Sequence, residues 1–257
     1  MKLEGVAVPH RATQILICTV GGHGPACKPI ENRDRFVALK KLLDAAKERR
    51  AVDLVVLPGG YFFAAQENPD EMPLLREIWA AIEERSIAVC FGVDTGHKRP
   101  NNKKAVKEQR LPSHGFAWTP ERGHVGPWRQ RSTSRLDQRD MSPDLANEER
   151  YIRVGTQRVA LLMCGELFNP KLRSAVQAQG ITVAVDMAHT GRGFRFAGAA
   201  KRWSSAKPIK AVLMSCHAER VGAAKRWSVA GKYKTARSAT VIVDAPVRIE
   251  GLVVSVP

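Results

Sequence analysis

A short apolar run that ends on a cysteine is the strongest indication of fold in this chain. Residues Val159 to Met163 are apolar, and Cys164, Gly165 and Glu166 follow at once. A run of this length bounded by turn signals predicts a buried strand, typical of the middle of a parallel sheet. Ligands bind at the carboxyl ends of such strands. Cys164 is therefore a candidate nucleophile, and the alternative is an ordinary buried thiol in the core.

Similar apolar runs alternate with amphipathic stretches along the chain. We expect strands near residues 13–20, 52–58, 86–93, 115–119, 158–164, 181–187, 211–216 and 239–244. Helices are expected at about residues 33–49 and 73–85, after Pro170, and at about 197–206, because apolar residues recur there at helical spacing. Alternation of this kind predicts an α/β architecture.

Three motifs, taken in order, resemble the landmarks of the nitrilase (carbon–nitrogen hydrolase) superfamily. They are Val52-Asp-Leu-Val-Val-Leu-Pro58, Pro127-Trp-Arg-Gln-Arg-Ser132 and Cys164-Gly-Glu166. The resemblance covers roughly Ile15 to Pro246, although each motif is short. It implies a four-layer αββα sandwich, a single carbon–nitrogen-hydrolase-like domain over residues 1–257, and a homodimer or larger homo-oligomer.

The resemblance also implies a Glu–Lys–Cys triad, of which this chain keeps one member. Cys164 matches the nucleophile, and Glu166 matches the acid that commonly follows it. The glutamate position is Gly59. The lysine position is Gln130 if Trp128 and Arg129 match the aromatic–Arg pair, or Arg131 with a slip of one residue.

These losses leave open which residues do the work of the missing two. Arg129 or Arg131 could stabilise developing negative charge, but an arginine cannot exchange protons as a lysine can. Gly59 has no functional side chain and could admit a ligand close to the backbone. We therefore expect substrate binding, rather than proton transfer, from Gly59, Gly60, Tyr61 and Gln130.

His189 is the candidate replacement base. It follows the strand expected after the one that ends at Cys164. A right-handed crossover would make these two strands parallel, with both carboxyl ends on one edge of the sheet. His189 would then approach Cys164, with Asp186 or Glu166 as the acid that orients it. The alternative is a surface or hydrogen-bonded histidine with no catalytic role.

Two functions follow from these residues. The first is hydrolysis of a non-peptide carbon–nitrogen bond in a small amide or nitrile, in which Cys164 forms a thioester or thioimidate. The second is a catalytically inactive family member that binds a ligand or a partner. The net charge of +16 and the Lys/Arg-rich residues 192–237 make a polyanion such as nucleic acid a candidate partner for the second.

Other features of the sequence bear on the cellular compartment of the protein and on whether it uses a metal, a cofactor or a membrane. Five cysteines without paired spacing are typical of a protein in a reducing compartment. Neither a Cys-x-x-Cys nor a His-Glu-x-x-His motif occurs, so we expect no metal and no cofactor. No apolar run approaches membrane-spanning length, and Met1 to Gly5 do not begin a signal peptide. We therefore expect a cytoplasmic protein without a membrane partner.

Overall fold

The computed structural model describes most of the chain. The described residues are 11–21, 30–49, 52–66, 68–95, 113–132, 150–190, 193–218, 230–231, 234–235 and 240–257. The strands are β1 (Thr13–Val20), β2 (Leu54–Val56), β3 (Phe62–Ala64), β4 (Ala88–Thr95), β5 (Ser113–Thr119), β6 (Gly123–Arg129), β7 (Tyr151–Val154), β8 (Gln157–Met163), β9 (Val183–Thr190), β10 (Ala211–His217), β11 (Ala230–Gly231), β12 (Lys234–Thr235), β13 (Thr240–Val243) and β14 (Ile249–Val256). The helices are α1 (Asn32–Glu48), α2 (Leu75–Arg85), α4 (Pro170–Ala178) and α5 (Gly193–Ser204), with short 3₁₀ helices η1 (Pro69–Glu71) and η4 (Cys164–Phe168).

The sheet is curled, and its central strands are parallel. Its order is β6-β5-β4-β2-β1-β10-β9-β8-β7. The neighbouring pairs from β4 through β2, β1, β10 and β9 to β8 are all parallel. The carboxyl ends of six strands therefore lie on one edge. Antiparallel strands β5 and β7 continue the sheet at either side, and β14 runs antiparallel to β1.

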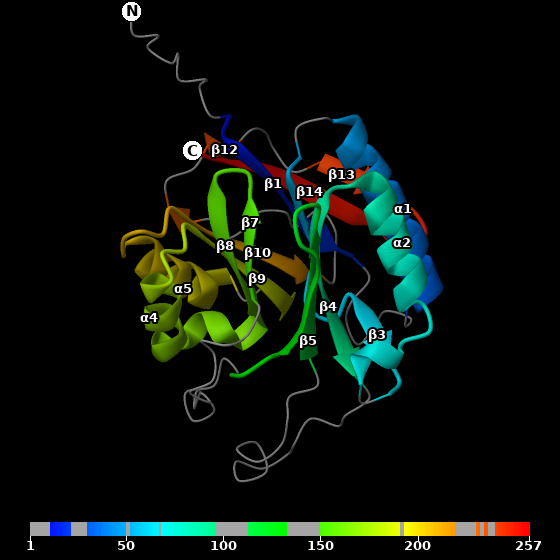
Figure 1. Cartoon of the computed structure of the whole chain (residues 1–257), viewed down its shortest axis with the longest axis horizontal. Helices are drawn as coiled ribbons and strands as arrows, with labels where there is room; N and C mark the ends of the chain where they lie inside the picture. Colours follow the sequence, from blue (N-terminus) through cyan, green and yellow to red (C-terminus); the bar gives the residue numbers. More distant parts are fainter. Residues whose placement is uncertain are drawn as a thin grey trace, which may run out of the picture.

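Helices cover the two outer faces of the sheet (Figure 1). One buried apolar cluster joins α1 and α2 to the outer faces of β1, β2 and β4. A second joins α4 and α5 to β8, β9 and β10. A third lies inside the curl, and there β5 contacts β7 and β8 across the interior. The order helix, sheet, sheet, helix confirms the predicted four-layer αββα sandwich.

Local sequence explains where the helices begin and end. Asn169 caps α4, because its side-chain oxygen accepts the N–H groups of Lys171 and Leu172. Pro170 occupies the first helical position, where its missing N–H costs nothing. Helix α2 ends at Ser86, which adopts the left-handed conformation typical of helix ends.

Most of the helices and strands in the structure agree with those predicted from the sequence. Each predicted strand is present with bounds shifted by a few residues, and each predicted helix is present. One shift matters for the site: the strand predicted over 158–164 ends at Met163, and Cys164 begins η4. Strands β3, β6, β7 and β14, together with the short β11 and β12, are not predicted by the sequence pattern. Strand β14 is the largest of these omissions, since it pairs with β1 along its whole length.

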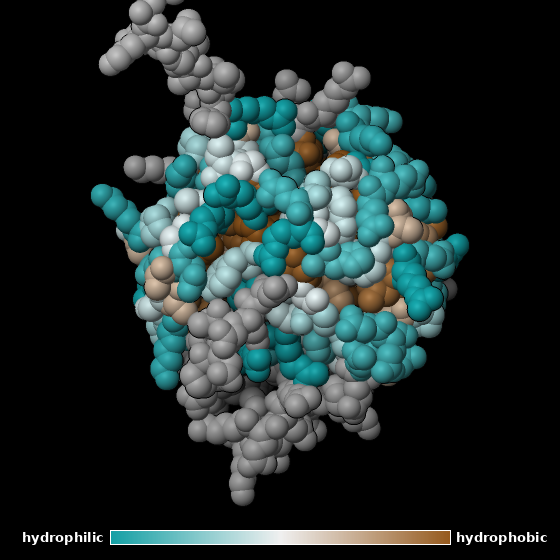
Figure 2. All heavy atoms as spheres, viewed as in Figure 1, coloured by the Kyte–Doolittle hydropathy of each residue, from teal (hydrophilic) through white to brown (hydrophobic). Residues whose placement is uncertain are grey.

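Polar side chains dominate the face shown in Figure 2, and hydrophobic residues show between them near its middle. Among the residues whose side-chain exposure is described, Phe63 and Val241 are the large apolar ones that are exposed. No helix in these ranges is both long and apolar enough to cross a membrane. Much of the Lys/Arg-rich segment 192–237 lies outside the described residues, so its predicted role in binding polyanions stays a prediction.

Candidate active site

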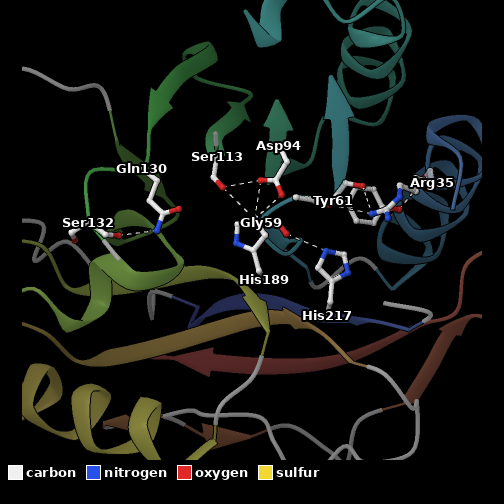
Figure 3. A network of polar contacts seen from close by, with 10 residues as sticks. Arg35, Gly59, Tyr61, Asp94, Ser113, Gln130, Ser132, His189 and His217 are labelled. Carbon is white, nitrogen blue, oxygen red and sulfur yellow. Dashed lines mark hydrogen bonds and ion pairs between the residues drawn. The ribbon is translucent and has the colours of Figure 1, made fainter. Parts of the chain in front are cut away.

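The shared strand edge gathers side chains that are distant in sequence. Asp94 lies near the end of β4, His189 near the end of β9 and His217 at the end of β10. Ser113 begins the antiparallel strand β5 and is paired with Asp94 across the two strands. Figure 3 shows the His189 ring pointing toward Asp94 and Ser113. Cys164 follows β8, which is the parallel neighbour of β9.

Cys164 sits on a sharp turn between a strand and a helix. Its φ of 47° is in the left-handed region, which residues with a side chain rarely adopt. Such strain persists only where the surrounding structure holds it, and it clusters at functional sites. Cys164 is partly exposed, whereas Cys18, Cys90 and Cys216 are buried. Burial raises the pKa of the Cys18 and Cys90 thiols, so these two are unreactive by comparison.

Glu166 locks this turn in place. Its Oε1 accepts the Arg131 N–H at 2.7 Å, and its Oε2 accepts the Met163 N–H at 2.9 Å. Oε2 also forms an ion pair with Arg150 Nη1 at 2.7 Å, and both side chains are fully buried. Every oxygen of this carboxylate therefore has a partner. This geometry favours a structural role for Glu166, because its carboxylate is buried and paired.

His189 forms the corresponding polar group on the other side. Its Nε2 lies 2.8 Å from Asp94 Oδ1 and 2.9 Å from Oδ2. The Ser113 hydroxyl donates to Asp94 Oδ1 at 2.8 Å and lies 3.3 Å from His189 Nε2. Burial alone would lower the pKa of His189. The hydrogen bonds and negative charges of Asp94 and Cys164 outweigh burial and raise that pKa to about 10.

Asp94 therefore has the orienting role that sequence analysis gave to Asp186 or Glu166. Asp186 points to the other face of β9, where its neighbours Ala184 and Ala188 belong to the cluster under α4 and α5. The sequence did contain a signal for Asp94. Like Cys164 and His189, it stands near the end of an apolar run, Ile87 to Val93.

Glycines make the room that His189 occupies. A Cβ built on Gly59 would lie 2.7 Å from the Met187 carbonyl oxygen and 3.1 Å from His189 Cε1. A Cβ on Gly60, whose φ is 63°, would lie 2.7 Å from Asp94 Oδ2. A Cβ on Gly92 would lie 2.5 Å from the Gly59 Cα. The imidazole of His189 thus fills the space into which a side chain at position 59 would point.

The turn that contains Gly59 is tied to the next strand by a second imidazole. His217 Nε2 lies 3.1 Å from the Gly59 carbonyl oxygen, and His217 is only 4% exposed (Figure 3). This contact fixes the Gly59 backbone against which His189 packs. Sequence analysis did not single out His217, although it too ends an apolar run, Ala211 to Cys216.

The remaining predicted residues differ in how they relate to this edge. Gln130 is buried, and its side-chain Nε2 donates to the Ser132 carbonyl at 2.8 Å. Its backbone N–H donates to the Ser113 carbonyl, which connects the lysine-matching segment to the His189 network. Arg131 meets Glu166 through its main chain.

Arg129 and Tyr61 are the two predicted residues that remain. Arg129 Nε lies 3.0 Å from His114 Nε2. Tyr61 is fully buried in the cluster beneath α1, and its hydroxyl donates to the Arg35 carbonyl at 2.8 Å. This position does not favour contact with a substrate, and the substrate-binding role of Tyr61 stays a prediction.

Metal ligation has no support in the parts of the chain just described. Among these residues, no group of three or more His, Cys, Asp or Glu side chains could hold a metal ion. The chemistry available at the edge is that of a thiol, an imidazole and a carboxylate. This set can form a nucleophile with its own proton carrier.

Comparison with known proteins identifies the fold through structure alone. No protein-family model and no curated protein sequence matches this chain. An amidase from Nesterenkonia sp. superposes with a TM-score of 0.59 at 11% identity, covering 98% of this chain and 93% of the amidase. A mutant of the Nesterenkonia sp. AN1 amidase in complex with butyramide gives 0.57 at 13% identity, covering 98% and 94%. A double mutant with acrylamide gives 0.61 at 10% identity, covering 96% and 93%.

Further structures of that enzyme are described as a nitrilase-superfamily amidase and as carrying acrylamide added at the active-site cysteine. The agreement extends over nearly the whole length of both chains, while the identity is too low to carry residue roles across. Strand order, layers and the superposition lead to one conclusion: this chain has the fold of the nitrilase-superfamily amidases.

Proposed function

We propose that the protein is a cysteine hydrolase that cleaves the carbon–nitrogen bond of a small amide, with Cys164, His189 and Asp94 as its catalytic group. The observation that carries the proposal is the His189 imidazole: Asp94 holds its Nε2, and Cys164 follows the strand that runs parallel beside the His189 strand. Cys164 is also among the causes of the raised pKa of His189. A pKa of about 10 means that the imidazole is protonated at neutral pH. A cationic imidazole beside a thiol favours the thiolate, which is the attacking form.

The reaction follows from these charges. The Cys164 thiolate attacks the amide carbonyl carbon, and the His189 imidazolium gives its proton to the leaving nitrogen as the C–N bond breaks. The amine departs and an acyl thioester remains on Cys164. Neutral His189 then takes a proton from water as the water oxygen attacks the thioester carbon. The C–S bond breaks, the carboxylic acid is released, and the Cys164 thiolate and His189 imidazolium are restored. Asp94 keeps the imidazole in one orientation throughout.

Arg129 and Arg131 are proposed to stabilise the negative oxygen of the tetrahedral intermediates. Both flank Gln130, the residue that matches the lysine of the resemblance. An arginine has a fixed charge and serves this electrostatic role without exchanging a proton. The small-amide substrate is supported by the amides bound to the structural neighbour. Gly59, Gly60 and Gln130 stay candidates for substrate contact.

The first test measures how fast iodoacetamide alkylates Cys164 as a function of pH. We expect fast labelling below pH 7 in the wild type, because the imidazolium stabilises the thiolate. Labelling should become slow in His189→Ala, and in Asp94→Asn it should fall by about tenfold or more at pH 6, since one pKa unit corresponds to a factor of ten.

Two variants serve as controls for this experiment. Cys164→Ser should abolish the label. His124→Ala removes a half-exposed histidine that pairs with Glu83 and lies on β6 outside the site, so it should label like the wild type. Labelling that rises only near pH 8.5 and ignores both substitutions would mean an ordinary thiol. That outcome would support the alternative, an inactive member that binds a ligand or a partner.

Turnover is then measured as ammonia released from acetamide, acrylamide and butyramide, and from the matching nitriles. A homodimer, which the resemblance implies, and a cytoplasmic location, which five cysteines without paired spacing favour, also remain proposals. Sedimentation velocity of the purified chain measures the first of these directly.

A further inference from the structure

Asp186 is a carboxyl group in an apolar layer. It is 1% exposed and faces the cluster of α4 and α5. Its cross-strand partners are Leu162 on β8 and Met214 on β10, both of them apolar. Nothing in the proposed reaction uses Asp186. A buried carboxyl is costly unless it is hydrogen-bonded or un-ionised, so its presence calls for an explanation.

The hydrogen bond of Asp186 is directed at Cys164. Its carboxyl accepts the backbone N–H of Cys164, while Oδ1 has no hydrogen-bond partner among the described residues. The titratable groups that act on it are Cys164 and Glu166 from η4 and His189 from its own strand. Of these, only His189 can be a cation, and Asp94 already pairs with it. Burial is the largest cause of a pKa for Asp186 well above the usual value.

We propose that Asp186 is a positioning residue: as an un-ionised carboxylic acid it accepts the Cys164 N–H and holds the nucleophile in its left-handed conformation. The N–H of a residue at the start of a short helix has no partner within the helix. Asp186 supplies that partner from the neighbouring strand. An un-ionised acid can do this without adding a negative charge beside a thiolate, which a carboxylate would destabilise. The catalytic meaning of this inference rests on the proposed function.

In this proposal Asp94 is an ionised carboxylate that orients His189, and Asp186 is an un-ionised acid that positions Cys164. Asp94 is partly exposed, accepts two hydrogen bonds and faces a cationic imidazole. Asp186 lies behind Cys164 in an apolar layer. Environments that separate the ionisation of neighbouring acids are a common way to divide roles within an active site.

The test compares Asp186→Asn with Asp186→Leu in the full-length protein. Asparagine keeps the shape and an accepting oxygen but cannot ionise, so it should label with iodoacetamide at the wild-type rate and with the same pH profile. Leucine removes the acceptor and leaves the Cys164 N–H unpaired. We expect about tenfold slower labelling at pH 7 in that variant, because a buried group without its partner is costly.

A second readout makes the state of Asp186 measurable on its own. Infrared difference spectra of wild type minus Asp186→Asn at pH 7 should contain the carbonyl stretch of an un-ionised carboxylic acid. Urea unfolding of the leucine variant, monitored by circular dichroism, should show a folded protein. Slow labelling would then reflect the geometry of Cys164 and not a loss of structure.

Each outcome decides the inference. A carboxylate band in place of the acid band, or a shifted labelling profile in Asp186→Asn, would overturn the un-ionised state. Wild-type labelling in a folded Asp186→Leu would overturn the positioning role. If the wild type itself labels slowly below pH 7, the proposed function fails, and the infrared band still tells whether Asp186 is un-ionised.

Discussion

The two sides of the candidate active site are built in different ways. On the nucleophile side, Cys164 and Glu166 match the resembled family, and the turn is held by a fully buried ion pair to Arg150. On the base side, the glutamate position is Gly59, and the chain supplies His189 from a different strand. The turn that holds Cys164 is kept in place by a buried ion pair. The position of His189 is possible because the residues that surround it are glycines without side chains.

This difference shows how the chemistry of a site can change while its scaffold persists. Strands β2, β4, β8 and β9 deliver their carboxyl ends to one edge whatever residues follow them. A proton carrier can therefore be supplied from any of several strand ends. Which strand end supplies it depends on where a side chain has room, and Gly59, Gly60 and Gly92 leave that room beside His189.

The largest expected effect breaks the nucleophile side. Glu166→Ala removes a fully buried ion pair to Arg150, and breaking such a pair should cost about 3–5 kcal/mol in the free energy of unfolding. Urea unfolding measures this quantity. Glu77→Ala is the matched control, because Glu77 pairs with Arg33 where both side chains are more than half exposed, and it should cost about 1 kcal/mol or less. Equal costs for the two variants would mean that the buried pair does not hold the turn.

An intermediate effect tests the base side. Gly59→Ala places a Cβ against the Met187 carbonyl and the His189 ring, so strain of about 1–3 kcal/mol is expected. Displacement of His189 should also slow Cys164 labelling below pH 7. Gly198→Ala in α5 is the control: its Cβ would meet only the Arg202 side chain at 3.7 Å, and it should stabilise the helix by about 0.5–1 kcal/mol. A neutral Gly59→Ala would contradict the close packing seen here.

The smallest expected effect sharpens the base side further. Ser113→Ala removes one hydrogen-bond donor to the Asp94 carboxylate, but the hydrogen bond between Asp94 and His189 stays in place. A hydrogen bond to a charged group contributes about 1.5–3 kcal/mol at most, and partial exposure of Asp94 reduces that. We expect labelling a few-fold slower at pH 6 and recovery in Ser113→Thr, which restores the hydroxyl. An effect as large as that of Asp94→Asn would mean that Ser113 acts on His189 directly.

Much of the fold follows from local pattern. The strands before Pro58 and Cys164, and the helix after Pro170, were predictable because apolar period and turn residues mark them. Strand β14 was missed because its alternation is weak and its partner, β1, lies far away in the sequence. Contacts of that kind are decided by the fold as a whole.

The site was predictable only in part, for a related reason. Cys164 and His189 could be placed from strand ends and the crossover rule. Asp94 could not be chosen over Asp186 from the sequence. What separates them is the face of the strand that each side chain occupies, and that is known only once the strands are placed in the sheet. Glu166 was a candidate for the acid that orients His189. The structure instead pairs it with Arg150, which directly precedes β7, and the sequence does not show this contact.

The clearance around Gly59 has a consequence for how such a site can arise. A glutamate at position 59 and the imidazole of residue 189 would claim the same volume. With the backbone placed as it is here, a glutamate at position 59 and His189 in its present position exclude each other. A lineage, or an engineer, moving between the two arrangements must pass through an intermediate that has lost one base before gaining the other, or must change both positions together.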